Sequence, residues 1–83
     1  MRHDQYAMVS GIIKRISTND QKKSLLIVDE QGMEYVFHIY EYTILIIFEN
    51  LKVGQKVDII FNGILTRSFP PQGNAILVNC LKI

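Results

Sequence analysis

Apolar and polar residues alternate along the first half of the chain, and turn-forming residues separate the alternating segments. Gly11 lies inside the first segment, where a strand can bend or carry a bulge. A polar turn at residues 17–21 follows this segment, and residues 29–32 end in a glycine suited to a hairpin turn. We therefore expect an antiparallel meander of three strands. The expected strands are residues 8–16, 23–28 and 33–40.

Residues 42–48 are almost entirely apolar, and their pattern fits either a short strand or the buried side of one helical turn. We expect a short strand at residues 43–46. A turn, or a single helical turn, is expected at residues 49–51. This segment holds more apolar residues than one short element of a small domain can bury.

Residues 55–61 alternate clearly and are expected to form a strand with Val57, Ile59 and Phe61 on its core face. Asn62 and Gly63 follow as the strongest hairpin signal in the chain. This signal predicts that residues 64–66 pair back across the turn.

Residues 67–73 contain both prolines and are expected to form an extended loop, followed by a last strand at residues 74–83. An aromatic residue precedes Pro70, which permits a cis peptide bond, although trans is the commoner form. Phe69 either covers the end of the core as a lid or is presented to a partner, and we expect the lid.

Composition favours an all-β fold. Thirteen Ile and six Val stand against seven Leu and two Ala, and β-branched residues prefer pleated sheets. Five principal strands in 83 residues predict a small five-stranded OB-like Greek-key barrel. We expect one domain over residues 1–83, with residues 1–6 flexible. The net charge of +1 excludes a strongly basic polyanion-binding tail.

Catalytic and metal-binding motifs are absent from the sequence. His3 and His38 have no ligand-spaced partner, Cys80 has neither a disulfide partner nor a recognisable base, and no Gly-rich phosphate loop is present. Cys80 alternates with Ile76 and Val78 on the last strand, which indicates a packing residue. We expect neither an enzyme nor a cofactor nor a bound metal.

Localisation is expected to be cytoplasmic. The apolar run at residues 42–48 is far shorter than the roughly 20 residues that span a bilayer, and no apolar segment follows the first residues as it would in a secretion signal. The alternative is an extracellular domain that is expressed without its signal peptide.

Nucleic-acid binding requires cations close to stacking groups. Lys14, Arg15, Lys22 and Lys23 lie on either side of the first expected hairpin turn, so in a barrel they would cluster at one end. The favoured alternative is a solvated hairpin whose charges protect a sheet edge. His38 and Tyr40 share the outer face of the third strand, as a small recognition surface or, as we expect, a half-buried surface pair.

Exposed apolar surface is the strongest indication of function. Tyr42, Ile44, Ile46 and Phe48, together with Phe69, are candidates for a protein contact, including self-association. We therefore expect a non-enzymatic binding or interaction module whose partner is a protein or a second copy of the chain. The alternative is a divergent single-stranded nucleic-acid-binding domain that uses Lys14, Arg15, Lys22, Lys23, His38 and Tyr40.

A set of residues spread over nearly the whole chain matches a family pattern: Val9–Ile13, Leu26–Asp29, Thr43, Val53–Val57, Phe61, Gly63, Ile64, Ser68, Pro70, Gln72 and Ala75. In these residues the sequence resembles a YobA-like domain-of-unknown-function family of short OB-like domains from Gram-positive bacteria. The resemblance implies the fold but no activity, and members of that family often follow a secretion signal.

A weaker similarity to cold-shock domains lies in residues 11–14, 35–38 and 51–57. Where that family has an aromatic pair, this chain has Arg15 and Ile16, and residues 23–28 lack its glycine- and aromatic-rich strand. Each lost aromatic platform removes about 1 to 3 kcal/mol of base stacking. The similarity therefore implies a shared fold without the shared function.

Overall fold

The computed structural model describes residues 5–81 as an all-β domain. Five strands form a closed barrel, and one short strand is added to it, as expected for a small OB-like barrel. None of the described residues forms a helix that could cross a membrane. The strands are β1 (Ala7–Asn19), β2 (Lys22–Val28), β3 (Glu34–Ile39), β4 (Ile44–Ile46), β5 (Lys56–Phe61) and β6 (Gln72–Asn79).

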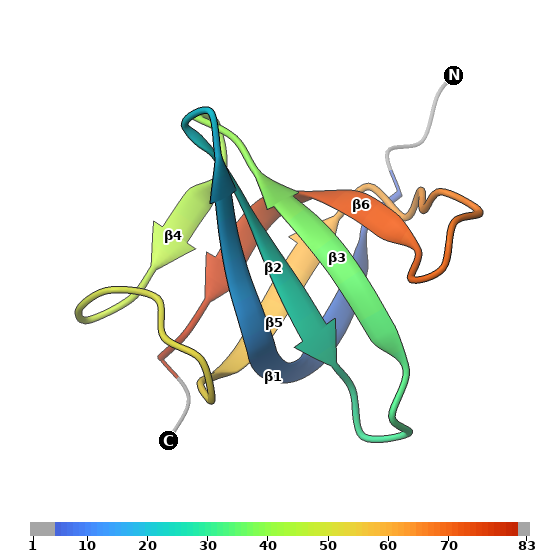
Figure 1. Ribbon diagram of the computed structural model, residues 1–83, viewed down its shortest axis with the longest axis horizontal. Helices are drawn as coiled ribbons and strands as arrows, with labels where there is room; N and C mark the ends of the chain where they lie inside the picture. Colours follow the sequence, from blue (N-terminus) through green and yellow to red (C-terminus); the bar gives the residue numbers. More distant parts are fainter. Residues whose placement is uncertain (1–4, 82–83) are drawn as a thin grey trace.

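The strands follow the order β3-β2-β1-β5-β6-β4, and an additional pairing of β3 with β6 closes the barrel (Figure 1). One edge of β6 pairs with β5 over residues 75–79. Its other edge is shared, because β3 pairs in parallel with residues 72–74 and β4 pairs in parallel with residues 77–79. β4 therefore continues along β6 where β3 leaves it.

The meander of β1, β2 and β3 confirms the expectation for the first half of the chain. β1 is long because it serves two partners: its first half pairs with β5 and its second half with β2, and it curves between them (Figure 1). A methyl group at Gly11 would overlap the carbonyl oxygen of Val28, so glycine is needed where the strands come closest. The bulge itself lies at Lys14, between Ile13 and Arg15.

The core fills the barrel from all five of its strands. Val57, Ile59 and Phe61 are buried on one face of β5, as the alternation predicts. Eighteen hydrophobic residues of the described chain form or pack against this core. The buried ones are Ile13, Leu25, Ile27, Phe37, Val57, Ile59, Phe61, Ala75, Val78 and Cys80.

A bulge in β6 changes which residues of the last strand are buried. Phe61 pairs with Ala75 and Ile60 with Leu77, so Ile76 is the extra residue and is only half-buried. The prediction that Ile76 shares a face with Val78 and Cys80 was wrong for this reason. Cys80 is buried in the core, as expected of a packing residue.

The expected hairpin at Asn62 and Gly63 was wrong. The turn exists, because Gly63 has a φ of 85° and the Ile64 N–H donates to Asn62 Oδ1 at 3.0 Å. Residues 64–66 nevertheless form no strand, since β6 occupies the edge of β5 that they would need. No helical turn forms at residues 49–51.

The expected lid over the core was also wrong, because the side chain of Phe69 is 96% exposed. Leu65 packs against the core in its place. The loop is held by its own hydrogen bonds, from Thr66 N to Gln72 O (2.8 Å) and from Ser68 Oγ to Pro70 O (2.8 Å), and the Phe69–Pro70 bond is cis.

β6 begins at Gln72, two residues before the expected start of the last strand, and ends at Asn79. The expected continuation to residue 83 falls partly outside the described residues, as do His3 and most of the segment expected to be flexible.

Candidate interaction surfaces

β4 carries an exposed apolar strip on the edge of the sheet. We define the strip as Tyr42, Ile44, Leu45, Ile46 and Phe48. All three side chains of β4 are exposed, and Tyr42 and Phe48 extend the exposed set beyond its ends. Of the sequence candidates, Ile44 and Ile46 thus lie on β4 itself, and Tyr42 and Phe48 lie two residues beyond its ends.

Alternate residues of the same segment hold β4 against the barrel. The buried Thr43 hydroxyl donates to the carbonyl oxygen of Ala75 at 2.7 Å and accepts from the Tyr40 N–H at 2.9 Å. Ile47 packs against the core. The strip is therefore exposed on a segment that is itself fixed.

The outer edge of β4 has no neighbouring strand among residues 5–81. Ile46 directs its carbonyl oxygen toward β6, where it accepts from the Cys80 N–H at 2.8 Å. Because successive residues of a strand point their backbone groups to opposite sides, the N–H and C=O of Leu45 face the free edge.

An aromatic row joins the strip to the outer face of β3. The rings of Tyr40 and Tyr42 are stacked with centroids 5.3 Å apart and an interplanar angle of 14°, and His38 lies 6.5 Å from Tyr40. His38 is half-buried, as expected, whereas Tyr40 is exposed. From sequence, His38 and Tyr40 and the strip are separate candidates. In the structure they form one continuous surface.

The basic candidates do not form one cluster. Arg15 pairs with Leu26, whereas Lys23 pairs with Thr18, three positions and therefore about 10 Å further along β1. Lys22 lies beyond Lys23, at the tip of the hairpin. The ammonium group of Lys14 lies 2.8 Å from Glu34 on β3. The bulge at Lys14 and the length of β1 separate charges that are close in sequence.

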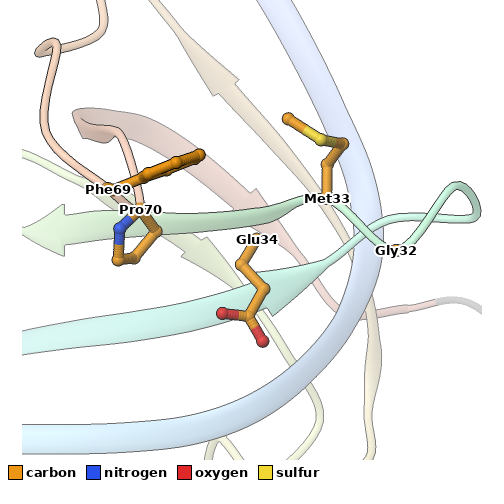
Figure 2. A pocket seen from close by; sticks show the side chains of 5 residues that line it. All are labelled: Gly32, Met33, Glu34, Phe69 and Pro70. Carbon is orange, nitrogen blue, oxygen red and sulfur yellow. The ribbon is translucent and has the colours of Figure 1, made fainter.

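Phe69 lies apart from the strip. With Pro70 it borders a shallow hollow of about 370 Å³, whose other side is formed by Gly32, Met33 and Glu34 (Figure 2). Glu34 begins β3, whereas the strip follows the end of that strand. The structure therefore does not join Phe69 to the other apolar candidates.

Comparison with known proteins gives a family but no described activity. Residues 8–82 match the family described as "Protein of unknown function (DUF3221)". The chain belongs to this family. Neither the curated proteins nor the solved structures provided a match to this DUF3221 chain.

Within the described residues of this DUF3221 domain, no group of three or more His, Cys, Asp or Glu side chains is placed to hold a metal ion. Burial raises the pKa of the Cys80 thiol, which disfavours the reactive thiolate.

Proposed function

We propose that this DUF3221 domain is a non-enzymatic interaction module that assembles with a second copy of itself through β4. The observation that carries the proposal is the exposed apolar strip on an unpaired sheet edge. Open strand edges with apolar side chains are sites where another strand is added to a sheet.

The sequence of the strip is nearly symmetric about Leu45. An isoleucine stands one residue away on each side, at Ile44 and Ile46, and an aromatic residue stands three away on each side, at Tyr42 and Phe48. In a two-fold antiparallel pairing centred on Leu45, each residue faces the one equally far on the other side of Leu45 in the second copy, so this pattern places similar residues opposite one another. This symmetry favours a second copy over an unrelated partner.

Antiparallel pairing of two β4 strands about Leu45 would exchange two hydrogen bonds between the Leu45 backbone groups. It would place Ile44 opposite Ile46 of the second copy and Tyr42 opposite Phe48 of the second copy. Cross-strand pairs of aromatic and β-branched residues each contribute roughly 0.2 to 1 kcal/mol. Since β4 has only three residues, we expect a weak dimer with a Kd on the order of micromolar.

Sedimentation equilibrium over increasing concentration tests the assembly. We expect a monomer–dimer equilibrium for the natural chain and a monomer for Ile44→Lys, because a lysine in the interface would be desolvated. Leu45→Pro should also be monomeric while it keeps the fold, since the backbone donor that it removes faces the free edge and pairs with no strand of the barrel.

Met8→Lys is the matched control, because Met8 is an exposed apolar residue on β1, outside the strip. It should dimerise like the natural chain. A natural chain that stays monomeric at high micromolar concentration, or an Ile44→Lys variant that dimerises normally, would contradict the proposal.

Single-stranded nucleic-acid binding is the second candidate. One observation supports it: the aromatic row begins on the outer face of β3 at His38, and β2 beside it begins at Lys22. The separation of the basic residues weakens it. Titration of a labelled oligonucleotide at low and moderate salt separates the two candidates, because a phosphate-driven complex weakens steeply with salt.

A further inference from the structure

We propose that a hollow between β3, β6 and the loop at residues 62–66 binds a neutral oligosaccharide. The hollow has a volume of about 330 Å³, within the range of small-ligand sites. Its polar lining comes from His38 on β3, Tyr40 directly after β3, Asn62 and Thr66 on the loop, and Gln72 and Asn74 on β6. The proposal does not depend on the assembly of two copies.

The topology creates this hollow. The parallel pairing of β3 with β6 places His38 beside Asn74 and Val36 beside Gln72. Gly73 lets the loop approach, since a Cβ atom there would lie 3.0 Å from Leu65 Cδ2 and 3.1 Å from Phe37 Cε1. The loop therefore packs over β6 and forms a wall of the hollow.

Hydrogen bonds within the protein hold the three amides in fixed orientations. Gln72 Oε1 lies 2.8 Å from His38 Nε2, and Asn74 Oδ1 accepts from the Tyr40 hydroxyl at 3.2 Å. Asn62 Oδ1 accepts from the Ile64 N–H at 3.0 Å. Each amide thus uses its oxygen within the protein, and each carries an NH₂ group with two further donors.

The ligand that fits these donors is rich in acceptors and carries no charge. None of the residues that line the hollow is Asp, Glu, Lys or Arg, so a bound anion would have no countercharge within it. Sugar hydroxyls are acceptors that can also donate, for example to the Thr66 hydroxyl oxygen. The rings of His38 and Tyr40, which lie beside the amides, offer the apolar surface that the C–H face of a sugar ring requires.

Titration of the ¹⁵N-labelled full chain with maltotetraose, cellotetraose and chitotetraose, followed by NMR, tests the proposal. At least one sugar should shift the signals of Asn62, Gln72 and Asn74, including their side-chain NH₂ groups, in a saturable way. Added salt should leave the affinity unchanged, because no charge is neutralised on binding.

Asn74→Asp removes the amide donors of Asn74 but keeps its size and its acceptor for Tyr40, and it should weaken binding at least tenfold. Asn79→Asp is the control: it makes the same change on the same strand, outside the hollow, and keeps the acceptor for the Leu81 N–H. It should bind like the natural chain.

Three outcomes would overturn the proposal. They are the absence of shifts with all three sugars, equal binding by the Asn74→Asp variant, and shifts of these same amides with inorganic phosphate but not with sugar.

Discussion

β4 and β5 flank the same strand, β6, yet the apolar side chains of β4 are exposed whereas those on one face of β5 are buried. Ile59 of β5 pairs with Val78 and is completely buried. Ile44 of β4 pairs with Leu77 and is 55% exposed, and Leu45, which pairs with the same Val78 as Ile59, is still 41% exposed. The two isoleucines lie on either side of one strand.

Barrel closure explains the difference. β5 lies between β1 and β6 inside the closed sheet, so one of its faces must point into the core. β4 joins β6 beyond the segment where β3 closes the barrel, and only one of its edges is paired. Apolar content therefore predicts that both segments form strands, whereas topology decides which one is buried.

The largest expected difference between β4 and β5 is in the stability lost when Ile44 or Ile59 is truncated to alanine. Ile59→Ala leaves a cavity in the core and should lower the free energy of unfolding by about 2 to 5 kcal/mol. Ile44→Ala should change it by roughly 0.5 kcal/mol or less, because the side chain is exposed. Urea denaturation at a concentration where the chain is monomeric measures both. Similar losses for the two variants would show that β4 is buried in solution.

The fixation of β4 can be tested at Thr43. Thr43→Val keeps the shape of the side chain but leaves the Ala75 carbonyl oxygen and the Tyr40 N–H without their partner, at a cost of about 1 to 3 kcal/mol. Hydrogen exchange of the Cys80 N–H, which donates to Ile46, should become faster as β4 loosens.

Thr43→Ser retains the hydroxyl and serves as the control for this prediction. It should keep slow exchange at Cys80. Equally fast exchange in both variants would mean that the methyl group, and not the hydrogen bonds, holds the strand.

Most of the barrel could be predicted from sequence because its strands alternate. Alternation alone predicts that Val57, Ile59 and Phe61 lie in the core, and the turn residues predict the meander. The prediction was wrong where long-range pairing decides the outcome. Asn62 and Gly63 form their turn, but β6 is a better partner for β5 than residues 64–66, and local sequence carries no information about that competition.

The candidate sites also differ in whether the sequence could predict them. The strip could be found because it is an excess of apolar residues in one contiguous segment. The amides of Gln72 and Asn74 could not, since they meet His38 and Tyr40 only through a parallel pairing of strands more than thirty residues apart. The sequence did not predict that Phe69 is exposed. The residue that packs against the core from this loop is Leu65, and local sequence does not distinguish between the two.

The smallest expected effect concerns Tyr35, which lies on the inner side of β3 and packs against the core. Burial, the nearby charge of Asp29 and a 3.3 Å hydrogen bond to that carboxylate raise the pKa of the Tyr35 phenol above its ordinary value of 10.0. Folding thus favours the neutral phenol. The resulting stability is fully present below about pH 10 and is lost as the pH rises from there through the folded pKa.

Burial also raises the pKa of Cys80, which acts in the same direction. The measurement therefore compares Cys80→Ala with Cys80→Ala/Tyr35→Phe by urea denaturation between neutral and strongly alkaline pH. The double variant should lose less stability above about pH 10, because a phenylalanine has no proton to retain. Parallel curves for the two proteins would show that the Tyr35 phenol has the same pKa in the folded and unfolded chains.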